Sequence, residues 1–223
     1  PTLGVNGYGW TQDFLPVGRL SLIVNQLDSL GVDEICLVNP TSNNMAAQMQ
    51  SFWCIVQQEL IDIATPIIIG GQVDCTEVEG FTLPSERLLL SSSFVERDFP
   101  VIDRLAELRG KQAIVAALPL RLKDFASIEV YHSRRGFWKE FSEADARFCQ
   151  ENADEIMIFD CVNEGSAKGF SWGLLDQLNF TSEKLIITGG ITSKCILEAE
   201  KRDLSAVFID NQILFSEGGR GFT

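Results

Sequence analysis

The run LIITGGI at residues 185–191 decides the fold of this chain, and PIIIGGQV at residues 66–73 repeats its pattern far upstream. A short run of β-branched residues predicts a strand buried on both faces, as in a parallel sheet. Two glycines after a strand let backbone N–H groups approach a ligand that a Cβ would keep away, although an ordinary tight turn has the same sequence. Because two copies occur at matched places, we interpret them as a duplicated half-barrel with paired ligand sites.

The length and composition favour one globular domain. At 223 residues the chain shows no linker or low-complexity segment, so we expect a single barrel domain over residues 1–223. The hydrophobic fraction of 45% is enough for a core, and the formal net charge of −13 argues against nucleic-acid binding. An acidic chain can still bind a small phosphorylated molecule, because backbone amides and helix N-termini make such sites.

Other sequence features bear on localisation and cofactors. No apolar run reaches the roughly 18 residues that a membrane span needs, and the first residues do not form a signal peptide, so we expect no membrane partner. The six cysteines are scattered without a CxxC pair, which indicates reduced thiols in a cytoplasmic protein. The single histidine, His132, is expected at the surface and leaves no second histidine for a metal site. We predict neither a metal nor a cofactor.

Short apolar runs alternate with segments of helical periodicity along the whole chain. The predicted strands are residues 1–5, 34–38, 67–69, 88–90, 113–118, 155–159, 185–188 and 206–209. The predicted helices are residues 20–30, 45–63, 99–109, 142–152, 172–178 and 194–202, with a brief or irregular one at 74–84. Residues 124–135 predict an extended or hairpin insertion.

Eight strand–helix units favour an α/β fold of the (β/α)8 TIM-barrel type, with some shortened loops, over an open doubly wound sheet. The first strand is not followed by the GxGxxG of a nucleotide-binding fold. In a barrel the carboxyl ends of the strands meet at one rim, where we expect Gly4, Asn39, Gly70, Ser91, Pro119, Phe159, Gly189 and Asp210. If Met157 points inward, strand alternation turns Phe159 inward and Asp160 away.

Several short motifs occur in an order and spacing that resemble the histidine-biosynthesis barrels, above all the cyclase subunit of imidazole glycerol phosphate synthase. The motifs are GVDE at 31–34, GG at 70–71, EI at 155–156, EGS at 164–166, GF at 169–170 and GG at 189–190. The likeness covers nearly the whole chain. It implies a bisphosphorylated substrate at the C-terminal face, and a glutaminase at the other face that feeds ammonia through the barrel. Relatives from surface-polysaccharide clusters, thought to assist sugar amidation, are similar too.

The resemblance breaks at the residues that perform the family's chemistry. The two catalytic aspartates of the family correspond to Gly4 and Pro119, and a third inward aspartate corresponds to Asn39. Neither glycine nor proline can transfer a proton, so acid/base chemistry of the family type is unsupported and the catalytic residues are unknown. The loop after the first strand, which closes over substrate in the family, is also short.

The phosphate-binding positions implied by the resemblance are kept unevenly. In the C-terminal half they are Gly165, Ser166, Gly189, Gly190, Asp210 and Asn211, and in the N-terminal half Gly71, Ser91 and Ser92. An inward carboxylate at Asp210 would repel a phosphate dianion. The alternative is that these glycines only preserve turns inherited from an ancestor.

The resemblance also implies an ammonia gate, whose members Glu34, Arg87 and Glu155 each stand at the start of a predicted strand. Charges at this end could equally be structural, because buried ions must be paired. If the gate is retained, the barrel docks a glutaminase subunit.

Two functions of different classes follow. One is a diverged cyclase-like lyase barrel that binds a phosphorylated, sugar-derived molecule and receives ammonia, in histidine biosynthesis or in surface-sugar amidation. The other is a non-catalytic binding or scaffold barrel, favoured by Gly4, Asn39 and Pro119.

Overall fold

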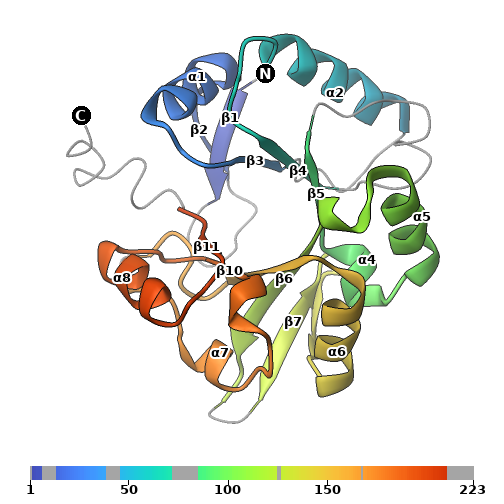
Figure 1. The fold of residues 1–223 in the computed structure, drawn as a ribbon, viewed down its shortest axis with the longest axis vertical. Helices are drawn as coiled ribbons and strands as arrows, with labels where there is room; N and C mark the ends of the chain where they lie inside the picture. Colours follow the sequence, from blue (N-terminus) through green and yellow to red (C-terminus); the bar gives the residue numbers. More distant parts are fainter. Residues whose placement is uncertain are drawn as a thin grey trace.

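A computed structural model describes residues 2–6, 14–38, 46–71, 85–124, 127–166 and 168–209. Its main sheet contains parallel strands in the order β3-β4-β5-β6-β9-β10-β11, which is also their order along the chain. Their bounds are Ile35–Val38 (β3), Ile67–Gly70 (β4), Arg87–Leu90 (β5), Ile114–Leu122 (β6), Glu155–Asp160 (β9), Leu185–Thr188 (β10) and Ala206–Val207 (β11). The sheet curls around a central axis (Figure 1).

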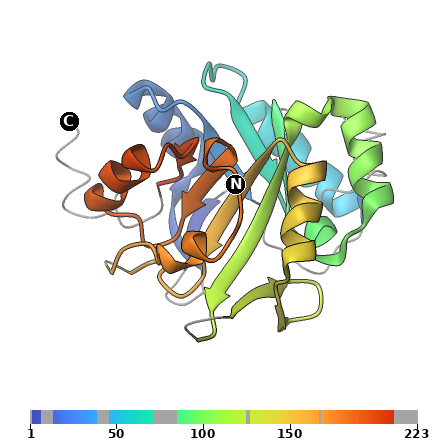
Figure 2. The same ribbon diagram turned by 60° about the horizontal axis from the view of Figure 1, so that its bottom comes forward.

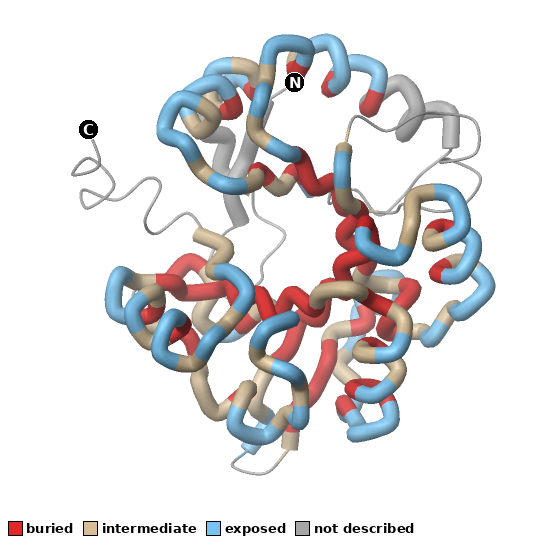
Figure 3. The backbone as a smooth tube through the Cα atoms, viewed as in Figure 1, coloured by how far each residue is buried: buried red, intermediate tan, exposed pale blue. Residues whose placement is uncertain are grey.

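Helices follow the strands and cover the outer side of the curled sheet (Figure 1). They are Leu20–Leu30 (α1), Ala46–Glu59 (α2), Ser92–Glu96 (α4), Phe99–Arg109 (α5), Glu143–Asn152 (α6), Gly173–Asp176 (α7) and Ser193–Lys201 (α8), with 3-10 turns at Lys111–Ala113 (η1) and Ser182–Lys184 (η2). The strands are mostly buried and the outward helix faces exposed (Figure 3). In the described part, no helix has the length and hydropathy to cross a membrane.

The predicted fold class is confirmed: strands and helices alternate around a curled parallel sheet, as in a (β/α)8 barrel. Residues 99–109 and 185–188 form the predicted helix and strand without any shift of their ends. Most other boundaries differ by one to a few residues, as expected for fraying helix and strand ends. The irregular helix expected at residues 74–84 lies outside the described residues.

The first strand differs from the prediction in its partner. Residues Thr2–Asn6 form a strand, β1, but within the described part it pairs antiparallel with Phe14–Arg19 (β2) in a separate two-stranded sheet. A parallel connection needs a dozen or more residues, and fewer than that separate β1 from β2. Pro16 and Gly18 are poor strand formers, which is why the sequence did not indicate β2.

The core has two layers, because successive strand residues point to opposite faces of the sheet. The inner layer consists of Ile68, Leu89, Val115, Ala117, Met157 and Ile186, with Cys36, Phe159 and Phe208 partly buried against it. The larger outer layer lies between the strands and the helices and includes Ile69, Leu88, Leu118 and Ile187. Met157 and Phe159 therefore both face inward, as strand alternation predicted.

The expected insertion is a hairpin attached to the longest strand. Ile128–His132 (β7) pairs antiparallel with the end of β6, and Phe137–Glu140 (β8) pairs with β7. This three-stranded extension projects beyond the carboxyl ends of the parallel strands (Figure 2). Of the two predicted forms the structure has the hairpin, but it runs to Glu140, five residues beyond the predicted range, and β6 continues to Leu122, four residues beyond its predicted end.

A capping box fixes the start of α6 directly after the hairpin. The Asp145 amide donates to Ser142 Oγ at 3.2 Å, and the Ser142 amide donates to Asp145 Oδ2 at 2.9 Å. These reciprocal bonds satisfy N–H groups that a helix start leaves without intrahelical partners. Arg97 Nε also donates to Asp145 Oδ1 at 2.9 Å.

Replacing Ser142 with alanine should lower the free energy of unfolding by about 1 kcal/mol, because it removes the cap. Urea unfolding followed by circular dichroism measures this loss. Thr192→Ala is the matched control, because Thr192 occupies the same position before α8 without a side-chain capping bond to the helix. Equal losses in the two variants would contradict a specific role for the Ser142 cap.

Candidate functional site

The structure brings Glu34, Arg87 and Glu155 together at the amino ends of the parallel strands. Arg87 Nε and Nη2 donate to Glu34 Oε1 and Oε2, both at 2.8 Å, and Arg87 Nη1 donates to Glu155 Oε2. The three side chains are only 18–26% exposed. We call these residues the base cluster. One guanidinium therefore holds two carboxylates from opposite sides.

The electrostatics of the base cluster are those of partly desolvated, paired charges. Burial raises the pKa of Glu34, and the hydrogen bond from Arg87 only partly offsets it. For Arg87, burial favours the neutral form, but the bonds to both carboxylates outweigh it and raise its pKa. Arg87 is therefore the residue that compensates both carboxylates of the cluster.

Inner-layer side chains lie directly above the base cluster on the same strands. Cys36, Leu89 and Met157 each follow a base-cluster residue by two positions and so share its face of the sheet. Burial, helped by the nearby Glu34 charge, raises the pKa of Cys36 to about 12, so this thiol is neutral. The interior of the curled sheet is consequently apolar from the base cluster up to Phe159.

At the carboxyl end of β9, Asp160 shapes the loop that carries Gly165 and Ser166. Asp160 is 1% exposed, and its Oδ1 accepts from the amides of Val162 and Asn163, both at 3.2 Å. Its Oδ2 accepts from Asn163 Nδ2 at 2.7 Å and from the Ser171 amide at 2.8 Å. Asp160 is thus a structural residue turned away from the interior.

The Gly189–Gly190 turn after β10 packs against that loop. Gly189 has φ +96°, and a Cβ there would lie 2.5 Å from the Asp160 carbonyl oxygen. Gly190 has φ +69°, and a Cβ there would lie 2.7 Å from the Asn163 carbonyl oxygen. Packing alone therefore requires both glycines, whether or not their amides also bind an anion.

The remaining predicted phosphate positions that the structure describes follow three different strands, β9, β4 and β5. Gly165 has φ +70°, and the amide of buried Ser166 donates to the Asn163 carbonyl oxygen at 2.9 Å. Gly71, with φ +94°, directly follows β4. Ser91 and Ser92 follow β5, and Ser92 Oγ lies 2.9 Å from Ser133 Oγ of the hairpin. Asp210 and Asn211 lie outside the described residues.

The structure describes two of the three positions at which the resemblance implies aspartates, Gly4 and Pro119. Pro119 pairs in register with Phe159 and shares the inward face of β6 with Ala117. Gly4 lies in β1 opposite Pro16, and Asn39 lies outside the described residues. Pro119 therefore puts an aliphatic ring at the interior, where it can neither donate nor accept a proton.

The expectation that His132 lies at the surface is wrong. It is 4% exposed, its Nε2 lies 3.2 Å from Glu96 Oε1, and its ring stacks on Phe137. In β7 it shares a face with Val130, which belongs to the outer core layer. His132 is therefore directed away from the interior of the sheet.

Cys161 is buried directly after β9, at the carboxyl ends of the strands, but it is not suited to nucleophilic chemistry. Burial raises its pKa well above the usual thiol range, and the charges of Glu164 and Asp160 raise it further. The thiol is consequently protonated at neutral pH.

Sequence reasoning missed Arg121, which lies on the hairpin extension beside Trp138. The Arg121 guanidinium stacks 4.1 Å from the centre of the Trp138 ring and donates to Glu129. One signal was present: leucines at 118, 120 and 122 keep the strand alternation beyond Pro119. That alternation puts Arg121 on the same face as Ala117.

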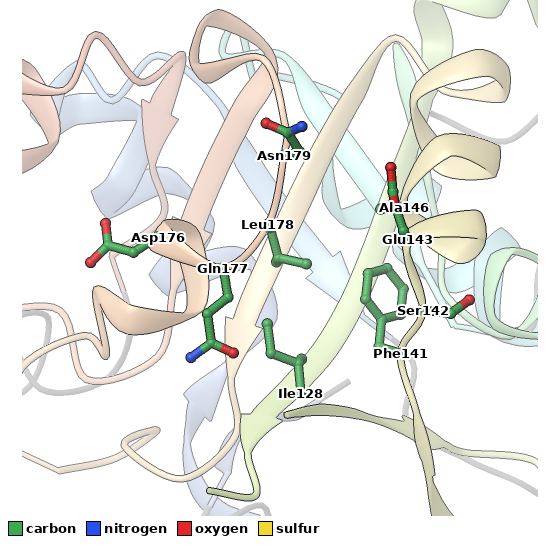
Figure 4. A pocket seen from close by; sticks show the side chains of 9 residues that line it. All are labelled: Ile128, Phe141, Ser142, Glu143, Ala146, Asp176, Gln177, Leu178 and Asn179. Atoms are coloured by element: carbon green, nitrogen blue, oxygen red, sulfur yellow. The ribbon is translucent and has the colours of Figure 1, made fainter. Parts of the chain in front are cut away.

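A separate hollow of about 510 Å³ lies on the outer side of the sheet, between the hairpin, α6 and the segment after α7 (Figure 4). Ile128, Phe141 and Leu178 line it, with polar residues such as Glu143 and Gln177. None of the predicted site residues lines this hollow.

Gly190→Val should destabilise the protein by more than about 2 kcal/mol, because the side chain would strain a positive φ and press on the Asn163 carbonyl. Differential scanning calorimetry measures the effect. Gly136→Val is a suitable control: Gly136 also has φ +69°, but a Cβ there would have only the Tyr131 hydroxyl oxygen within 4 Å, at 3.9 Å. Similar losses at both positions would attribute the effect to φ rather than to packing.

Comparison with known proteins agrees with this architecture. Residues 17–217 match the family described as Histidine biosynthesis protein. A search of curated proteins found no match. Since the match spans most of the chain and the structure is a curled parallel α/β sheet, the chain belongs to the histidine biosynthesis protein family.

Proposed function

We propose that this chain is a diverged cyclase-subunit-like barrel that binds a phosphorylated, sugar-derived molecule at the carboxyl ends of its strands. At the opposite end it receives ammonia from a glutaminase subunit, either in histidine biosynthesis or in amidation of a surface sugar. Family membership supports the barrel type. The base cluster supports the cyclase-like role and the partner, and the loops after β9 and β10 support the ligand.

The observation that carries the proposal is the base cluster beneath an apolar interior. Glu34, Arg87 and Glu155 come from three different strands and form one ion-paired layer at the amino ends. Above it, the described residues of the inner core layer include Ile68, Leu89, Val115 and Met157, which are all apolar. Such an interior disfavours ammonium and accepts neutral ammonia, because an unpaired ion is costly to desolvate. A change in the Arg87 pairing would open the way into that interior.

The loops after β9 and β10, which pack against each other, support the proposed phosphate site. The Gly189–Gly190 turn lies directly against the loop that carries Gly165 and Ser166. Backbone amides and a helix N-terminus at α8 can together hold an anion. The same glycines also satisfy a packing requirement, because a Cβ at either position would collide with the loop after β9.

The second candidate function is a non-catalytic binding or scaffold barrel. Pro119 favours it, since this residue faces inward at the position of a catalytic aspartate and cannot carry out acid/base chemistry. The two candidates share the ligand and the barrel but differ in turnover and in the use of ammonia.

Arg87→Met tests the ammonia route. A histidine-biosynthesis-type glutaminase subunit mixed with the unmodified protein should form a complex on size-exclusion chromatography and hydrolyse glutamine faster than alone. The variant should lose most of this stimulation. Arg104→Met is the control, because Arg104 pairs with Glu107 on the exposed face of α5. Failure of the unmodified protein to bind or stimulate the glutaminase would contradict the proposed partner.

The stability of the same variant should depend on pH if Arg87 stabilises the ionised carboxylate of Glu34. Without Arg87, repulsion and burial raise the pKa of Glu34 further, so the free energy of unfolding should fall by about 1–3 kcal/mol at pH 7. A raised carboxyl pKa destabilises only where the group is ionised, so the loss should vanish below about pH 4. Urea unfolding between pH 4 and pH 7 measures it.

With ammonium salts and the substrate of the imidazole glycerol phosphate synthase cyclase, the isolated protein should show no appreciable turnover. The reason is that Gly4 and Pro119 supply no proton-transfer group. Liquid chromatography of the products provides the measurement, with an ordinary cyclase subunit as the positive control. A kcat on the order of 1–10³ s⁻¹ would show that other residues perform the chemistry.

A further inference from the structure

The extension formed by the end of β6, β7 and β8 turns one of its faces toward the same side as the interior of the sheet. Val115 and Ala117 of β6 belong to the inner core layer, so strand alternation puts Arg121 on that face too. Residues directly opposite in antiparallel strands share a face, which adds Glu129 opposite Arg121, and Tyr131 opposite Trp138. We call this surface the hairpin face.

Arg121 is held in a fixed orientation on the hairpin face. Its Nε and Nη2 donate to Glu129 Oε2 at 2.9 and 2.6 Å, and its guanidinium stacks on Trp138. Trp138 in turn packs against Tyr131, with ring centroids 5.2 Å apart. A guanidinium that is fixed by an ion pair and by stacking on a ring loses little conformational entropy when it binds a ligand. The third nitrogen of Arg121, Nη1, is not used in the two bonds to Glu129.

Beside β6, the two cations of this face are more exposed than the carboxylate with which they pair. Glu129 is 8% exposed, and Lys123 Nζ also pairs with it, at 3.3 Å. The Arg121 and Lys123 side chains are 36% and 61% exposed. The exposed carboxylate of this face, Glu140, lies opposite Glu129 on the outer strand β8, farther from β6. Two accessible cations therefore cover one buried carboxylate in a chain whose net charge is −13.

The hairpin face adjoins the predicted phosphate positions. Ser133, in the turn of the hairpin, lies within hydrogen-bonding distance of Ser92 after β5. At the other edge of β6, the Cys161 amide donates to the Leu120 carbonyl oxygen at 3.0 Å, so the β9 loop starts beside Arg121. The hairpin thus stands between the loops of both half-sites.

We propose that Arg121, assisted by Lys123, is a phosphate-binding subsite of the ligand pocket at the carboxyl ends of the strands. This inference rests on the proposed function, since it adds a binding residue to the same pocket. Arginine suits the task because its planar guanidinium remains charged and donates hydrogen bonds to phosphate oxygens in a defined geometry. The ligand that fits is an anionic sugar phosphate that reaches from the strand ends to the hairpin.

The test is isothermal titration calorimetry with fructose 1,6-bisphosphate and inorganic phosphate as probes. The double variant Arg121→Gln/Glu129→Gln removes the pair without leaving a buried carboxylate alone. It should bind the bisphosphate roughly tenfold or more weakly than the unmodified protein. Arg121→Lys should bind with intermediate affinity, because it keeps the charge but not the planar geometry.

Arg134→Gln is the matched control, since Arg134 lies in the same hairpin but pairs with Glu96 at 2.7 Å. It should bind like the unmodified protein, and all variants should keep their circular dichroism spectra. If the folded Arg121 variants bind as tightly as the unmodified protein, the subsite is wrong while the proposed ligand stands. If the unmodified protein binds neither probe, both the proposed ligand and the subsite are wrong.

Discussion

The register of the parallel strands is the constraint on which the arrangement of this protein depends. Arg87 lies in register with Ile68, and Glu155 with Val115, so neighbouring strands are staggered and the long Arg87 side chain bridges the stagger to reach Glu34 and Glu155. Because side chains repeat every second residue, the next inward layer is apolar, and the one above it contains Pro119 and Phe159. A one-residue slip of any strand would exchange its inner and outer residues and expose the charges to the wrong environment.

Much of the fold could be predicted because local signals agreed with tertiary packing. Gly31 and Gly110 mark the ends of α1 and α5, and Ser142 caps α6, so these boundaries were readable from single residues. The end of β6 could not be predicted from the sequence, because a proline such as Pro119 usually ends a strand. Proline is tolerated there since β5 pairs with β6 only as far as Ala116, and β7 begins pairing only at Leu120. Only the tertiary structure reveals that gap.

Site residues at the starts of strands could be predicted from the sequence. Residues whose roles depend on how loops pack could not. The grouping of Glu34, Arg87 and Glu155 followed from the family resemblance together with their places at strand starts. The role of Asp160 depended on partners as far as Ser171, which no spacing rule indicates. For Gly189 and Gly190 the sequence left two readings, and the close approach of Asp160 and Asn163 gives one of them a sufficient physical cause.

The continuity of β6 has a kinetic meaning. The strand passes from the parallel sheet into the hairpin extension without a break, and its two ends are bonded to different partners. A segment that swings open and shut needs hinge residues able to absorb changes in φ and ψ, and β6 offers none between Ile114 and Leu122. We therefore expect the hairpin to keep its position rather than to open and close as a lid. A molecule that arrives at this end of the protein meets a surface already in place, and its capture is timed by diffusion and orientation rather than by closure.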